Sequence, residues 1–175
     1  MTLKSLEQHA EVAVADSHGG MVGADAGIDE NSPGANKGDS VLKVQSKGPG
    51  DDFRALVRFT LPAVGEGCGV SAATLRLHSE KDQPGRTLEV RRLATPWSEM
   101  GVTWSIRPPT AGEPVRGPAG EGELRFDVTS LVAAGAANSF EIRDAELHGP
   151  GAEHGFYSRE TGESPPVLVV SFSAL

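Results

Sequence analysis

The chain has 175 residues, a length that suits one domain with a hydrophobic core of its own. Its formal net charge of −8 argues against binding nucleic acid through the phosphate backbone, which requires a basic surface, and against adsorption to anionic lipid. A single cysteine, Cys68, excludes an intramolecular disulfide and a metal site built from several cysteines.

The 22 glycines and 12 prolines divide the chain into many short elements, which favours an all-β architecture over a helical bundle. Residues 1–20 stand apart as an N-terminal arm, with a short strand predicted at residues 10–15. Residues 21–175 are expected to form one domain, a β-sandwich or a barrel.

Alternating apolar and polar residues predict four strands in this domain, at residues 53–61, 73–77, 88–93 and 123–127, and an apolar run predicts a fifth at residues 167–172. The first of them places Arg54 and Arg58 on the face opposite to its apolar side chains. The last is almost wholly apolar, so we expect a central strand that is buried on both sides.

One short helix is predicted between these strands. Asp127 can cap a segment that runs through Ala134 and ends near Gly135. The proline- and glycine-rich residues 108–122 are expected to form a long loop.

The two tryptophans, Trp97 and Trp104, lie seven positions apart in a turn-rich segment. Rings this close mark either a sugar-stacking surface or a corner of the core, and we expect at least one of them in the core.

Arginines on predicted neighbouring strands can form a row that binds the carboxylates of an acidic polysaccharide. The alternative, which we favour, is that they pair with acidic residues across strands. The candidate carbohydrate-binding residues are Arg54, Arg58, Arg76, Trp97 and Trp104.

Acidic residues suggest a second type of site. Asp25, Asp29 and Glu30 offer alternating oxygens in a loop, which suit Ca2+ although their spacing is not that of an EF-hand, and Glu160 can complete such a site from another loop. An equal alternative is a solvated turn held by local side-chain hydrogen bonds. Ca2+ is the one cofactor expected, and because no catalytic sequence motif occurs, no enzymatic activity is predicted.

Blocks of sequence occur in the order and spacing of a known family, at residues 24–29, 54–59, 72–77, 97–104, 126–129 and 156–160. Residues 21–173 thereby resemble the DNRLRE-domain family, also described as family 96 carbohydrate-binding modules and related to disaggregatase-type repeats. Lys37 stands where an aromatic residue is usual in that family. The hexapeptide that names the family is not present intact.

The resemblance implies a jelly-roll β-sandwich without catalytic activity, in a family whose members include binders of acidic polysaccharides such as alginate. We therefore expect an attachment module located outside the cell or on a particle surface. The N-terminal arm and the lack of a visible signal peptide favour an alternative. In it, the chain is a structural subunit, such as a virion decoration protein, a head fibre or an extracellular filament protomer. Expected partners are polysaccharide or neighbouring protein subunits, with no nucleic acid and no membrane insertion.

Overall fold

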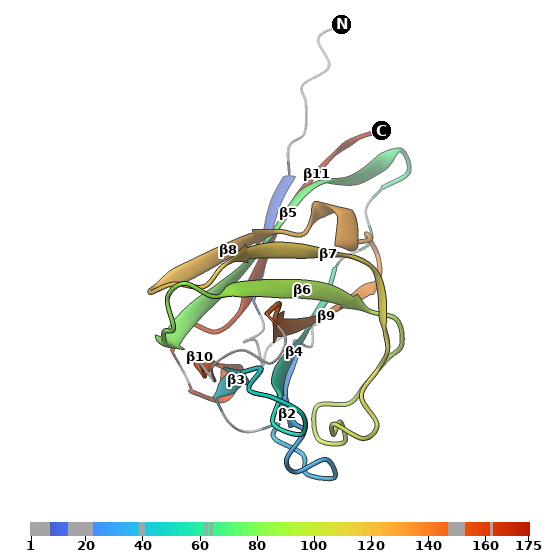
Figure 1. The fold of residues 1–175 in the computed structure, drawn as a ribbon. Helices are drawn as coiled ribbons and strands as arrows, with labels where there is room; N and C mark the ends of the chain where they lie inside the picture. The colour runs from blue at the N-terminus through green and yellow to red at the C-terminus, as the bar shows by residue number, and fades with distance from the viewer. Residues whose placement is uncertain are drawn as a thin grey trace, which may run out of the picture.

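The computed structural model describes residues 8–13, 23–38, 41–61, 63, 65–146, 153–161 and 163–175. These residues form two antiparallel β-sheets that face each other (Figure 1). The predicted all-β sandwich is confirmed. No helix in the described part of the chain is long and apolar enough to cross a membrane.

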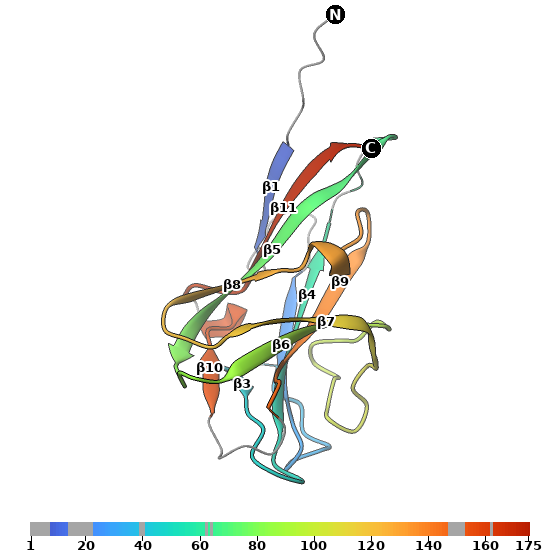
Figure 2. The same ribbon diagram turned by 45° about the horizontal axis from the view of Figure 1, so that its top comes forward.

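The first sheet is built around one long strand that pairs with three others. In spatial order its strands are β1 (Gln8–Ala13), β11 (Val167–Ala174), β5 (Cys68–Lys81), β10 (His154–Phe156) and β3 (Leu42–Val44), and β8 (Glu123–Asp127) also pairs with β5. Figure 2 shows β1, β11 and the first half of β5 running side by side beyond the rest of the sandwich.

The second sheet carries Arg54 and Arg58, two of the candidate sugar-binding residues. Its strands, in spatial order, are β2 (Ala24–Asp29), β4 (Phe53–Thr60), β9 (Ala137–Asp144), β6 (Thr87–Leu93) and β7 (Thr110–Pro118). Both edge strands, β2 and β7, have one neighbour each among the strands of this sheet.

The two faces of the second sheet bury different sets of apolar side chains. Ala55, Val57 and Phe59 of β4 point into the main core between the sheets. Leu56 points the other way, into a smaller cluster on the outer face. That cluster is closed by the connection between β6 and β7, which supplies Trp97, Val102 and Trp104. The loop is therefore fixed to the sheet by apolar burial.

The predicted helix is shorter than expected. A 3-10 turn, η1, spans Thr129–Leu131, and its N-cap position is Val128, not Asp127 as predicted. Asp127 lies one residue earlier, where its Oδ1 accepts the Thr129 N–H at 3.1 Å. The continuation through Ala134 is wrong, because the backbone is already extended at Val132. The side chain of Asn138 bonds both the N–H and the C=O of Ala133, which removes the need for helical partners. A second 3-10 turn, η2, spans Arg159–Thr161.

Two other predictions differ from the structure. The loop expected at residues 108–122 contains strand β7, whose prolines are tolerated because β7 lies at the sheet edge. The segment at residues 167–172 is a strand, paired on both sides, but it is not buried on both faces. Leu168, Val170 and Phe172 are buried, whereas the residues between them are half-exposed.

The strand predicted in the N-terminal arm is confirmed at Gln8–Ala13, where β1 pairs antiparallel with β11. The rest of the arm, residues 1–7 and 14–20, lies outside the described residues. β1 is an edge strand of the first sheet, held in the ladder through its backbone groups.

Candidate functional site

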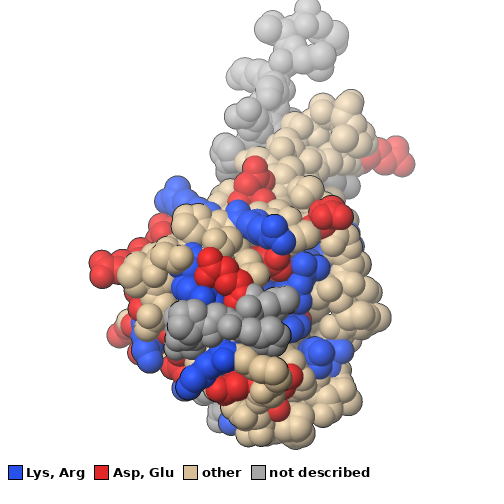
Figure 3. Space-filling view, viewed as in Figure 1, with Lys and Arg blue, Asp and Glu red and all other residues tan. Residues whose placement is uncertain are grey.

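A row of arginines crosses the outer face of the second sheet. We call it the arginine face; its members are Arg54 on β4, Arg143 on β9, Arg91 on β6, Arg116 on β7 and Arg107 in the β6–β7 loop. The neighbours of these residues on β6 and β9, such as Val90 and Ile142, point into the core, so period-two alternation places the arginines outside. Acidic and basic side chains are interleaved on the side of the molecule drawn in Figure 3.

Glu89 is the centre of this face. Its two carboxylate oxygens accept N–H groups from Arg91 at 2.9 Å, from Arg116 at 2.8 and 3.0 Å, and from Arg143 at 2.9 Å. Burial alone would raise the pKa of Glu89, but the hydrogen bonds from these arginines outweigh it and lower the pKa to about 2. The three guanidiniums carry more N–H donors than the Glu89 carboxylate can accept. Arg143 also lies 3.9 Å from Glu141, so three arginines face two carboxylates and leave an excess of one positive charge.

Arg54 continues the row toward the tryptophan loop. Its Nη1 lies 3.2 Å from the buried carboxylate of Glu141, and its guanidinium lies 4.8 Å from the ring centre of Trp104. Arg107 lies over the same ring at 4.2 Å and donates to the Trp104 carbonyl at 2.7 Å. Trp104 thus positions two cations of the arginine face.

Trp97 and Trp104 are core residues more than surface residues. They are 8% and 9% exposed, so each ring offers little area for stacking on a sugar. The Trp97 Nε1–H donates to Ser139 Oγ at 3.1 Å, and the Arg58 guanidinium lies 5.2 Å from the Trp97 ring centre. Arg58 also donates to the Trp97 carbonyl at 2.5 Å, so it ties the loop to β4.

The five carbohydrate-binding residues predicted from the sequence therefore do not form a single site. Arg54 and Trp104 belong to the arginine face, and Arg58 and Trp97 lie beneath the adjoining loop. Arg76 is on the other sheet, where its Nε lies 3.3 Å from Glu123.

A shallow groove of about 360 Å³ marks the β7 end of the arginine face. It is lined by Arg91 and Arg116 together with Gly112, Glu113 and Pro114. The Arg116 side chain is 61% exposed, which makes it the most accessible guanidinium at the Glu89 centre. A bound anionic group can reach Arg116 without any change in the sheet.

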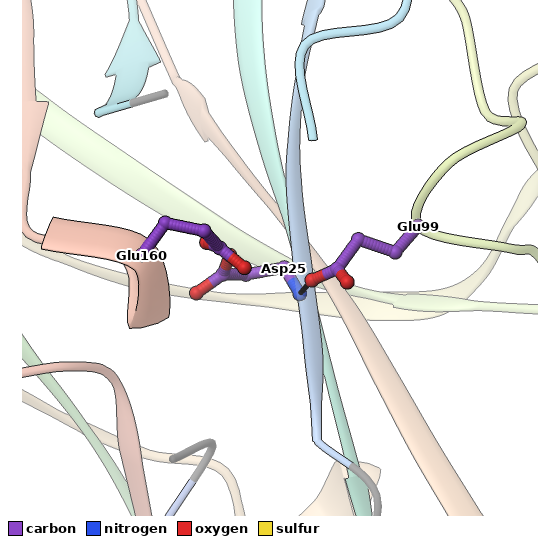
Figure 4. Close-up of side chains that lie close together, drawn as sticks. All are labelled: Asp25, Glu99 and Glu160. Atoms are coloured by element: carbon purple, nitrogen blue, oxygen red, sulfur yellow. Dashed lines mark hydrogen bonds between the residues drawn. The ribbon is translucent and has the colours of Figure 1, made fainter. Parts of the chain in front are cut away.

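A second group of candidate site residues lies beside β2, an edge strand of the second sheet. Asp25, Glu99 and Glu160 place one carboxylate oxygen each within 4.8 Å of the others, from β2, the β6–β7 loop and η2 (Figure 4). Such a group could hold a metal ion. The Arg159 guanidinium lies beside it, with Nη2 at 2.5 Å from Glu99 and 3.0 Å from Glu160.

Local structure explains how Glu99 reaches β2. The loop turns at residues 98–102, where the Val102 N–H donates to the Ser98 carbonyl at 2.9 Å. Asn36 Nδ2 donates to the carbonyls of both Glu99 and Val102 at 2.8 Å. Any side chain at Gly38 would clash, since its Cβ would lie 2.8 Å from the Glu99 carbonyl oxygen. This fixed turn lets Glu99 accept the Asp25 N–H at 3.0 Å.

Asp25 is fully buried. Its Oδ2 accepts the Arg159 N–H at 2.8 Å, while its Oδ1 has no hydrogen-bond partner among the described residues. Burial is the main cause that raises the pKa of Asp25 to about 8, and the nearby carboxylates of Glu160 and Glu99 raise it further. Protonation of Asp25 thus lowers the free-energy cost of burying three carboxylates close together.

The predicted calcium ligands divide into two groups. Asp25 and Glu160 lie together, joined by Glu99, which the sequence analysis did not select. Asp29 and Glu30 are elsewhere: Asp29 Oδ1 accepts the Asn31 N–H at 2.8 Å, and Glu30 Oε2 accepts the Asp52 N–H at 3.0 Å. Asp29 therefore holds a local turn, as the alternative interpretation expects, whereas Glu30 joins the end of β2 to the residue before β4.

Comparison with known proteins identifies a family and structural neighbours. The model of carbohydrate-binding module family 96 matches residues 20–172. The solved structure of a family two carbohydrate esterase from Cellvibrio japonicus is similar at a TM-score of 0.36 and 10% identity. That alignment covers 97% of this chain, which spans 36% of the esterase chain. No curated protein matches the sequence.

Proposed function

Because the chain belongs to carbohydrate-binding module family 96, we propose that it binds an acidic polysaccharide through the arginine face and attaches its parent protein or particle to that polymer. The observation that carries this proposal is the cluster of Arg91, Arg116 and Arg143 around the single carboxylate of Glu89. The proposal includes no catalytic step.

The charge and geometry of the arginine face fit a polymer that bears carboxylates or sulfates. A guanidinium binds such groups with two parallel hydrogen bonds, which gives both strength and orientation. The excess of positive charge lies on a protein whose net charge is −8, so it concentrates attraction for polyanions on one face. Buried Glu89 and Glu141 hold the arginines in place before a ligand arrives.

The residues around this face have supporting roles in the same proposal. Trp104 orients Arg54 and Arg107, and Arg58 with Trp97 fixes the loop to the sheet. Arg76 lies outside the proposed binding face. A location outside the cell or on a particle surface is part of the proposal, as is Ca2+ as an ion that supports the structure.

Replacing Arg116 by glutamine should lower the affinity for a polyuronate by about 10-fold or more, because a charge-assisted contact is lost. Its high exposure means that the fold should keep its melting temperature within a few degrees. Isothermal titration calorimetry of both proteins with the same polymer measures the difference.

Arg125→Gln is the matched control. Arg125 is 66% exposed and pairs with Glu123 at 3.3 Å, but it lies on β8 of the other sheet. Polyuronate affinity should be unchanged in this variant. Equal losses in the two variants would point to nonspecific attraction and would remove the arginine face from the proposal.

A second candidate function rests on β1. An edge strand can pair with a neighbouring copy instead of its own sheet, so the chain could build an assembly through strand exchange. In that case deletion of residues 1–20 would leave a folded sandwich and abolish the assembly. Light scattering of the full and the shortened chain over a range of concentrations tests this. A monomer at every concentration in both would exclude it.

A further inference from the structure

We propose that Asp25, Glu99 and Glu160 form a divalent-cation site suited to Ca2+, which joins β2, the β6–β7 loop and η2. All three ligands are carboxylates, and carboxylate oxygens are the ligands that Ca2+ prefers. They come from positions 25, 99 and 160, so only the folded chain brings them together.

The distances fit one ion. Calcium binds oxygens at 2.3–2.6 Å, so two ligands of the same ion lie at most about 5 Å apart. The three selected oxygens lie within 4.8 Å of one another. In Figure 4 the Glu160 side chain reaches the Asp25 carboxylate from one side, while Glu99 reaches the Asp25 backbone from the other.

The buried Oδ1 of Asp25 indicates that a cation belongs at this site. Asp25 is 0% exposed and its Oδ1 has no partner among the described residues, although buried polar atoms are rarely left unpaired. The charges are also unbalanced when Asp25 is ionised, the state that binds a cation, because three carboxylates then face the single guanidinium of Arg159 and leave an excess of two negative charges. One divalent cation would satisfy the oxygen and neutralise that excess.

The ion would also connect the site to sugar binding. Glu99 lies in the same loop as Trp104 and Arg107, and Trp104 positions Arg54 on the arginine face. A cation that fastens Glu99 to β2 therefore holds one end of the arginine face in place. This connection rests on the proposed function, whereas the cation site itself does not.

The test is calcium titration of the full chain, after treatment with a chelator, by isothermal calorimetry and thermal unfolding. We expect one Ca2+ per chain and a melting temperature raised by about 5–10 °C at 100-fold excess over the dissociation constant. Asp25→Asn should abolish both effects. Its amide keeps the shape of the carboxyl and can still accept the Arg159 N–H, so the variant should fold.

Asp29→Asn is the control, since Asp29 lies on the same strand outside the three-carboxylate cluster, and it should bind Ca2+ like the unchanged chain. Absence of Ca2+ binding to the unchanged chain would overturn the proposal, as would equal binding by Asp25→Asn. Loss of calcium binding in Asp29→Asn alone would place the site in the acidic turn instead. Polyuronate binding measured in the same samples separates the two proposals, because Ca2+ binding without polymer binding would contradict only the proposed function.

Discussion

Trp97→Ala is expected to lower the free energy of unfolding by about 3–5 kcal/mol, the usual cost of removing a large buried aromatic side chain. Trp97 is 8% exposed and packs in the outer cluster with Leu56, Leu93 and Val102. The substitution leaves a cavity under the β6–β7 loop and removes the partner of Ser139 Oγ. Urea unfolding followed by circular dichroism measures the loss.

Trp97→Phe separates packing from hydrogen bonding. It keeps an aromatic ring in the cluster and loses the indole N–H, so a smaller cost of about 1–2 kcal/mol is expected. Ile106→Ala serves as a loop control, because Ile106 is 68% exposed and should change stability by less than about 0.5 kcal/mol. A cost for Trp97→Ala as small as that of Ile106→Ala would mean that the tryptophan loop does not depend on the outer cluster.

Glu89→Gln should lower stability at neutral pH by about 3 kcal/mol, because the pKa of Glu89 falls from 4.5 to about 2 on folding. A carboxyl whose pKa is lowered stabilises the fold at pH values above its unfolded pKa. That contribution is lost as the pH falls from about 4.5 toward 2. The variant should therefore lose less stability than the unchanged chain over this range.

The measurement is the free energy of unfolding between pH 2 and 7 for both chains. Glu123→Gln is the matched control, since Glu123 also pairs with two arginines but is 34% exposed and should cost no more than about 1 kcal/mol. Parallel pH curves for Glu89→Gln and the unchanged chain would contradict the role of Glu89 as the charged centre of the arginine face.

Strand positions could be predicted from the sequence because alternation reports directly on a half-buried strand. Residues 53–61 and 73–77 alternate clearly, and β4 and β5 lie there. Strand β7 could not be predicted in this way, because Gly112, Pro114 and Gly117 carry the signals of a loop. Only its position at the sheet edge makes those residues compatible with a strand, and edge position is a property of the whole sheet.

The candidate sites, too, depend on contacts between distant parts of the chain, which local sequence does not predict. Asp25 and Glu160 could be selected because acidic residues suit a cation, but Glu99 joins them through a turn that depends on Asn36 and Gly38. Arg143 and Arg116 were missed because their role depends on the order of β9, β6 and β7 in the sheet. Local sequence contains no signal for that order.

The central claim is recognition of an acidic polysaccharide, and affinity for matched charged and neutral polymers tests it most directly. The comparison uses a polyuronate and the same polymer after chemical reduction of its carboxyl groups, both measured by calorimetry at low and at moderate salt. We predict binding to the polyuronate that weakens with salt, and affinity at least about 10-fold lower for the reduced polymer. Equal affinity for the two polymers, or no binding to the polyuronate, would contradict the account.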